Sequence, residues 1–261
     1  MDVAGYEFSI LSGACLVVCF VFFIGGIVDA TCGGGGLVIV PGLLAVGMPP
    51  HTTVGTNQFA QLFGTTTALI KYHRSGNINW NIAFMSAPFA LVGAFIGARL
   101  NLLISEHYLQ IVMLALMPVL LIFSIVAKPG EEDRSDTVSK GRMIIGAALI
   151  GLVVGGYHAF YGPASGLFFV IAYTTVTRLD MLKANGIARF ELILANIVGG
   201  SIYAFNDNMC WKAIIPATIA YIGGNYLGAS LAISKGAKFI RPMYYCVLAG
   251  LFIKLIYDFF F

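Results

Sequence analysis

Long apolar runs alternate with short polar or glycine- and proline-containing breaks along nearly the whole chain. A membrane-spanning helix needs about 20 mainly apolar residues, and this pattern predicts ten helical segments. They are expected at residues 8–28, 37–47, 54–72, 81–103, 108–127, 143–161, 167–177, 184–204, 212–232 and 240–260. The pattern therefore predicts an all-α polytopic membrane protein.

Segments 37–47 and 167–177 are too short to cross a membrane. Each would rise about 16 Å as a helix, roughly half of a hydrocarbon core. The first follows four consecutive glycines, Gly33 to Gly36, and the second follows the stretch GPASG that starts at Gly162. A break inside the membrane frees backbone groups that lipid cannot bond, so it must be buried in protein or line a polar cavity. Paired broken helices indicate a transporter site, and we expect these two half-helices to meet near the bilayer midplane.

The two halves of the chain resemble each other. A shift of 130 places Gly25, Gly26 and Gly36 on Gly155, Gly156 and Gly166. A shift of 131 places Gly55, Phe59, Tyr72, Asn77, Trp80, Gly93, Gly97, Ala98 and Leu100 on Gly186, Phe190, Tyr203, Asn208, Trp211, Gly224, Gly228, Ala229 and Leu231. Matches at two adjacent offsets indicate a duplication. We therefore predict an N-terminal repeat at 1–127, a cytoplasmic linker at 128–142 and a C-terminal repeat at 143–261. Since each repeat holds five segments, an odd number, the repeats are expected to be inverted.

The basic residues predict the orientation of the chain. If both termini lie outside, eleven basic residues fall in cytoplasmic connections and two, Arg99 and Lys212, fall outside. The eleven are Lys71, Arg74, Lys128, Arg134, Lys140, Arg142, Arg178, Lys183, Lys235, Lys238 and Arg241. An excess of Lys and Arg marks cytoplasmic loops. We therefore expect a multi-pass protein of the inner or plasma membrane with both termini outside.

Composition agrees with a membrane protein and excludes several other classes. Hydrophobic residues make up 59% of the 261 residues and charged residues 10%, with a mean hydropathy of +0.88. A soluble domain carries about 25% charged residues. The net charge of +3 gives no reason to expect a nucleic-acid partner. The five cysteines form no ligand cluster, so neither a metal nor another cofactor is expected.

The two breaks have the chemistry of an anion site. A half-helix begins at each break, with free N–H groups and the positive end of its dipole pointing into the gap. The candidate residues of the breaks are Gly33, Gly34, Gly35, Gly36, Gly162, Ser165 and Gly166. The alternative is that these glycines only permit close helix packing. Packing is the favoured interpretation for Gly93 and Gly97 and for their repeat partners Gly224 and Gly228.

Arg189 is the outstanding charged residue because it falls inside segment 184–204. A guanidinium within a membrane is costly and usually functional, and its planar fork suits oxyanions. We expect it to contact substrate; the alternative is a structural ion pair with Glu191 or Asp29. Further polar candidates for the lining of the site are Thr56, Asn57, Gln58 and Asn196.

Two residues are candidates for proton coupling. Asp29 lies just before the first break, and a buried carboxylate can carry a proton; alternatively, it caps the following half-helix. His158 lies near the second break and is either a proton carrier or a satisfied interfacial histidine. The aromatic residues Trp80, Trp211, Tyr72 and Tyr203 are interpreted as interfacial anchors.

Several of these stretches resemble the TauE/SafE sulfite-exporter family. They are DATCGGGGLVIVP from Asp29 to Pro41, GMPPH from Gly47 to His51, GTN from Gly55 to Asn57 and FYGPASG from Phe160 to Gly166. The resemblance implies a transporter of small anions such as sulfite, sulfoacetate or other organosulfonates, working outward with protons as a candidate coupling ion. The second break departs from the family's usual Gly-Pro-Gly-x-Gly. Ser165 could donate a hydrogen bond there, which favours an organosulfonate larger than sulfite.

Three function classes remain at this stage. The leading hypothesis is a secondary transporter, an exporter of a small sulfur-containing oxyanion that works by alternating access and is coupled to protons. An anion channel of similar selectivity is the nearest alternative. An intramembrane enzyme is disfavoured because the spans contain no HExxH motif and no catalytic dyad. The expected partners are a small anion, the lipid bilayer and protons, and assembly into a homo-oligomer is left open.

Overall fold

The computed structural model describes residues 13–109, 111–112, 115 and 133–236. The helices over this part of the chain are α1 (Gly13–Cys32), α2 (Gly36–Ala45), α3 (Pro50–Arg74), α4 (Trp80–Leu103), α6 (Lys140–Phe160), α7 (Ser165–Ala172), α8 (Met181–Phe205) and α9 (Trp211–Lys235). A 3₁₀ turn, η2 (Ser135–Thr137), precedes α6, and a π-helical turn, η3 (Tyr173–Thr177), continues α7. The predicted segment 240–260 and most of 108–127 lie outside the described residues.

The all-α membrane fold is confirmed for the described chain, which contains no strand. By length and composition, α1, α4, α6 and α8 are each able to cross a membrane. Helices α3 and α9 also have 25 residues each, and α3 carries many polar side chains. Capping explains why α8 begins earlier than its apolar run, since the Asp180 side chain accepts hydrogen bonds from the backbone N–H groups of Leu182 and Lys183.

Both predicted breaks are present, and they are shorter than expected. The first comprises residues 33–35, so that Gly36 already begins α2, and the second comprises residues 161–164, so that Ser165 begins α7. The breaks touch each other, because the Gly33 carbonyl accepts a hydrogen bond from the backbone N–H of Leu167 at 3.1 Å. Gly33 has φ +80°, and a Cβ at this position would overlap the backbone of Gly166. The two interrupted helices therefore meet inside the protein.

Equivalent positions of the two sequence halves make equivalent contacts. Gly55 packs on the carbonyl of Asn208, and its match Gly186 packs on the carbonyl of Asn77, the match of Asn208. The matched tyrosines also bond near the two breaks: the Tyr72 hydroxyl donates to the Ala30 carbonyl and the Tyr203 hydroxyl to the Ala159 carbonyl, each at 3.0 Å, although the two acceptors are one position out of register. These pairs are what a duplication predicts. The inverted orientation of the repeats and their boundaries stay predictions.

The glycine stripes pack helices together, as their sequence spacing predicts. Gly93 and Gly97 of α4 lie against the backbone of α6, where Gly97 faces Gly156. Gly224 and Gly228 of α9 lie against the backbone of α1. The packing interpretation is therefore confirmed for these four glycines.

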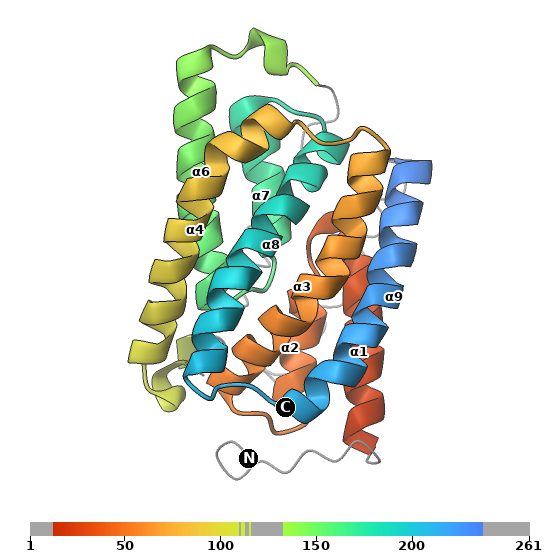
Figure 1. Ribbon diagram of the computed structural model, residues 1–261, viewed down its shortest axis with the longest axis vertical. Helices are drawn as coiled ribbons and strands as arrows, with labels where there is room; N and C mark the ends of the chain where they lie inside the picture. Colours follow the sequence, from red (N-terminus) through yellow and green to blue (C-terminus); the bar gives the residue numbers. More distant parts are fainter. Residues whose placement is uncertain (1–12, 110, 113–114, 116–132, 237–261) are drawn as a thin grey trace.

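The connections divide between the two ends of the molecule (Figure 1). The α3–α4 connection, the start of α6, the α7–α8 connection and the end of α9 lie at the upper end of that view. The end of α4 and the α8–α9 connection lie at the lower end. Most of the basic residues in the described connections between helices therefore lie at the upper end. Which end faces the cytoplasm stays a prediction.

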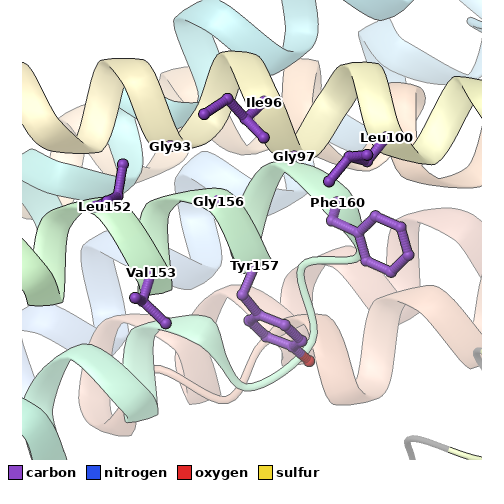
Figure 2. A pocket seen from close by; sticks show the side chains of 9 residues that line it. All are labelled: Gly93, Ile96, Gly97, Leu100, Leu152, Val153, Gly156, Tyr157 and Phe160. Atoms are coloured by element: carbon purple, nitrogen blue, oxygen red, sulfur yellow. The ribbon is translucent and has the colours of Figure 1, made fainter.

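An apolar groove of about 460 Å³ lies along the line where α4 packs on α6. Figure 2 shows Ile96 and Leu100 on one side and Leu152, Val153, Tyr157 and Phe160 on the other. None of the described residues that line this groove carries a charge. It has none of the chemistry expected of an anion site, which must be sought at the junction of the breaks.

The prediction that Tyr72 and Tyr203 are interfacial anchors is wrong. Both side chains are completely buried, and their hydroxyl groups bond to carbonyls near the two breaks. Trp211 is 54% exposed at the start of α9, where an anchor is expected. A tyrosine near a helix end can anchor the helix at the membrane interface or donate a hydrogen bond inside the protein. Here the breaks supply backbone carbonyl groups that need such donors.

Candidate functional site

Arg189 is completely buried and forms an ion pair with the buried Asp29. Its Nη1 lies 2.5 Å from Oδ2 of Asp29, in the last turn of α1, and its Nη2 donates to Oδ1 of Asn185 at 3.0 Å. The hydroxyl of Tyr221 donates to the same Asp29 oxygen at 2.7 Å. The sequence left Asp29 and Glu191 as alternative ion-pair partners of Arg189. Pairing with Asp29 is confirmed, and pairing with Glu191 is wrong. The Asp29 side chain does not cap α2, whose first turn has no side-chain cap, so the capping alternative is wrong as well.

Neighbouring side chains satisfy the carbonyls that the first break leaves free. The last carbonyls of a helix have no intrahelical partner. The Asn185 amide donates to the Thr31 carbonyl at 2.9 Å, and the Tyr72 hydroxyl donates to the Ala30 carbonyl. The Asn185 amide also donates to the Tyr72 hydroxyl at 2.8 Å. Helices α3 and α8 thus hold the broken end of α1 against Arg189.

The glycines of the breaks let the charged pair approach the backbone. A Cβ on Gly35 would lie 2.5 Å from Cβ of Asp29. A Cβ on Gly166 would lie 2.8 Å from Nη2 of Arg189. A Cβ on Gly36 would lie 2.9 Å from Cα of Pro163, in the other break. The first turns of α2 and α7 therefore both adjoin the Asp29–Arg189 pair.

A neutral polar group lies beside the second break. His158, at the end of α6, is 2.6 Å through Nδ1 from the Ser165 hydroxyl and 2.8 Å through Nε2 from Oδ1 of Asn196. The Gln58 amide donates to the carbonyls of His158 and Ala159, at 3.2 and 3.0 Å. His158 thus connects the start of α7 to α8. Its two polar neighbours inside the protein agree with the interpretation of a satisfied histidine and leave a role in proton transfer untested.

Three buried N–H donors around the second break have no partner among the described residues. They are Nε of Arg189, Nδ2 of Asn57 and Nδ2 of Asn196. Asn57 faces the break, because its Nδ2 would lie 3.7 Å from a Cβ on Gly162. Asn196 contacts His158, which in turn contacts Ser165 beside the second break. Nη2 of Arg189 lies close to Gly166. A buried donor without an acceptor costs about 1–3 kcal/mol, so this arrangement favours the binding of an acceptor.

Some predicted residues lie elsewhere or act differently. The Thr56 hydroxyl accepts a hydrogen bond from the backbone N–H of Cys210 at 2.9 Å, so it faces the α8–α9 connection. Gly34 is buried in the first break, where its carbonyl accepts from the N–H of Leu37. Oε1 of Gln58 lies against Gly199 and has no partner in the described structure. The roles of these residues in binding stay untested.

Three residues that contact the Asp29–Arg189 pair or its partners were not expected there from the sequence: Asn185, Tyr72 and Tyr221. Asn185 precedes Arg189 by four residues and therefore shares its helix face, a signal that could have found it. Tyr72 was assigned to the interface. For Tyr221 the sequence offers no signal, because its position in the first repeat is occupied by Ala90.

Comparison with known proteins gives a consistent result. The model of the family described as "Sulfite exporter TauE/SafE" matches residues 18–255. The "Probable membrane transporter protein ORF9" of a Sinorhizobium species is 30% identical over 237 residues, which is 90% of each chain. The "Probable membrane transporter protein YfcA" of Escherichia coli K12 is 31% identical over 246 residues, covering 93% of this chain and 89% of the relative. The "Probable membrane transporter protein YdhB" of Bacillus subtilis is 26% identical over 248 residues. No solved structure matches the chain significantly.

Proposed function

Because this chain belongs to the sulfite exporter TauE/SafE family, we propose that it is a secondary transporter that exports a small sulfur-containing oxyanion. The substrate class is sulfite or an organosulfonate, moved by alternating access with proton coupling. The family and the similar membrane transporters support a transport function. The junction of the two breaks supports an anion as the substrate and is the proposed binding site.

The observation that carries the proposal is the set of buried donors without partners, on Arg189, Asn57 and Asn196. A sulfonate or sulfite group offers three oxygen atoms that accept hydrogen bonds. The guanidinium adds charge-assisted hydrogen bonds, which contribute about 1.5–3 kcal/mol each. The first turns of α2 and α7 add backbone N–H groups and the positive ends of their helix dipoles.

Asp29 supplies a route to proton coupling. In the structure its carboxylate neutralises Arg189, so a monoanion entering the site would leave one net negative charge in a buried place. If Asp29 takes up a proton, Arg189 is free to neutralise the anion. Proton and anion are then bound together in a neutral complex and move in the same direction. Net efflux follows when the internal excess of anion outweighs the proton gradient.

Substitution of Arg189 tests the anion site. Arg189→Lys keeps the charge but loses the planar fork, and Arg189→Ala removes both. We expect Arg189→Lys to impair flux of sulfite or sulfoacetate from proteoliposomes and Arg189→Ala to nearly abolish it. Loss of two charge-assisted bonds predicts binding weaker by about a hundredfold or more in isothermal titration.

The matched control is Arg99→Lys, since Arg99 is exposed at the end of α4. It should leave flux and affinity unchanged. Wild-type affinity in a folded Arg189→Ala protein would contradict the proposed site. Flux that follows the electrochemical gradient of the anion alone, with no response to an imposed proton gradient, would instead favour a channel.

A further inference from the structure

A second buried carboxyl group, Glu191, lies outside the proposed anion site. It follows Arg189 by two residues on α8, which places it about 200° around the helix. Its side chain has no exposed surface. Oε1 contacts the Ser86 hydroxyl of α4 and lies 3.5 Å from the Tyr173 hydroxyl of the π-helical turn. Oε2 has no hydrogen-bond partner among the described residues.

The described surroundings of Glu191 hold no compensating charge. The hydrophobic cluster on this side of α8 includes Ile187 and Ala188, one turn before Glu191. Its members also include Ile82 and Ala83 from α4, Ala147, Ile150 and Val154 from α6, and Phe169 and Val170 from α7. The titratable group that faces Glu191 from the described elements is the Tyr173 phenol. On α8 itself, Arg189 is paired with Asp29. An ionised Glu191 would therefore be a buried charge without a counter-ion, which is costly.

The hydrogen-bond network around Glu191 accommodates a protonated carboxylic acid. The Tyr173 hydroxyl donates to the Ser86 hydroxyl oxygen at 2.8 Å. The Ser86 hydroxyl has backbone acceptors of its own, the Ala83 carbonyl at 3.2 Å and the Ile82 carbonyl at 3.3 Å. The oxygen of Ser86 can then accept a second hydrogen bond, from the acid group of Glu191. If Glu191 is ionised, Ser86 and Tyr173 both turn their hydroxyl protons toward it instead. Two hydroxyl donors do not offset a full charge in apolar surroundings, so the network fits the neutral acid better than the carboxylate.

This network joins the half-helix of the second break to α4. Tyr173 is the first residue of the π-helical turn that continues α7, and its ring stacks on Phe169 one turn earlier. The other end of α7 begins with Ser165 and Gly166 at the anion site. π-helical turns are rare and are found frequently at functional sites. Glu191 therefore lies near the C-terminal end of α7, and the proposed anion site lies near its N-terminal end.

We infer that Glu191 is a proton-binding site distinct from Asp29, and that its proton holds the π-helical turn of α7 against α4. The proton is taken up from water and returned to water, and no other bond changes. Loss of the proton leaves a buried charge that favours separation of α7 from α4, which lets water reach Glu191. Proton release is thus linked to movement of a half-helix of the anion site. The link to transport rests on the proposed function, whereas proton binding at Glu191 does not.

Infrared difference spectroscopy of the purified protein tests proton binding directly. Glu191→Gln replaces the acid with a neutral side chain of nearly the same shape. Wild type should show a carboxylic-acid carbonyl band that is present at acidic pH, lost as the pH is raised, and missing from Glu191→Gln. Glu106→Gln is the matched control, since Glu106 is exposed, and it should retain that band. If spectra of wild type and Glu191→Gln show the same acid bands at every pH, the inference is wrong.

Flux measurements in proteoliposomes test the link to transport. Glu191→Gln should bind the anion within about threefold of wild type, while its flux loses the part of the pH dependence that comes from Glu191. Wild-type pH dependence in Glu191→Gln would overturn the link. Tyr173→Phe, which removes one donor to the ionised form, should move the midpoint of the acid band and of the flux to higher pH. An unchanged midpoint in Tyr173→Phe contradicts the proposed network. If wild type carries no flux of these anions, the proposed function fails, and the infrared result still decides proton binding.

Discussion

At the scale of single residues, the pair of Asp29 and Arg189 sets the charge of the junction. Breaking a buried ion pair by removing one partner costs about 3–5 kcal/mol, because a charge is left uncompensated. Asp29→Asn should therefore lower the melting temperature of the purified protein without anion. A bound anion replaces the lost carboxylate, and ligand at a hundred times Kd stabilises by about 2.7 kcal/mol. Anion should accordingly raise the melting temperature of Asp29→Asn more than that of wild type.

The control for this experiment is Asp207→Asn. Asp207 is exposed, and asparagine tolerates its positive φ of 55°. Thermal unfolding with and without sulfite and sulfoacetate provides the measurement, and flux at two values of pH completes it. Asp29→Asn should lose the part of the pH response that comes from Asp29. If anion stabilises wild type and Asp29→Asn equally, Asp29 does not compete with substrate for Arg189.

The residues of the site were only partly predictable from the sequence. Arg189 stands out because charge is rare inside an apolar run, and the break glycines stand out because helices disfavour them. Tyr72 and Tyr221 do not stand out, because tyrosine suits both the interface and the core. Their roles depend on which carbonyl or carboxylate a distant helix brings near them. Such contacts between remote segments leave no local pattern.

At the scale of elements, the contact between the two breaks leads to a prediction about Gly33. An L-residue in the left-handed region costs about 1–2 kcal/mol, and Gly33 and Gly76 share this conformation, with φ of +80° and +73°. They differ in the room available for a side chain, because a Cβ on Gly33 would overlap Gly166, whereas a Cβ on Gly76 meets nothing within 4 Å. Gly33→Ala should therefore lose far more thermal stability and anion binding than Gly76→Ala.

This pair of variants separates backbone strain from crowding. Thermal unfolding of both detergent-purified proteins gives the comparison, with anion titration for whichever variant folds. Equal loss in the two variants would show that strain alone sets the requirement for glycine, and that the contact between the breaks contributes little.

The sequence predicted both short helices but neither the π-helical turn nor the limits of the breaks. Helix length and glycine content are local properties, so the interruptions were visible. Whether Gly36, Ser165 and Gly166 belong to a break or to the next helix depends on the packing of one break against the other. The turn at Tyr173 has no marker in its sequence, YTTVT, and is tied to the contacts with Ser86 and Glu191.

At the scale of the whole molecule, the internal repeat was the strongest prediction from the sequence, because it uses many positions at once. The paired contacts of Gly55 and Gly186 follow it closely. The charged site breaks the symmetry, since Arg189 matches Gln58 and Asp29 has no charged match. On the predicted duplication, each repeat supplies one break and the second repeat supplies the cation. That asymmetry accounts for a single charged pair at a junction built by both halves.

The last prediction concerns how the molecule sits in the membrane. The positive-inside rule places the end with the α3–α4 and α7–α8 connections in the cytoplasm. Asp136 in η2 lies at that end, Asp207 lies in the α8–α9 connection at the other, and both side chains are exposed. After removal of the five native cysteines, an impermeant thiol reagent added to intact cells should label Asp207→Cys and spare Asp136→Cys. Both should react after the membrane is opened, which controls for accessibility. Labelling of Asp136→Cys alone in intact cells would show that the orientation is opposite to the predicted one. Labelling of both variants in intact cells would contradict the placement of η2 and the α8–α9 connection on opposite sides of the membrane.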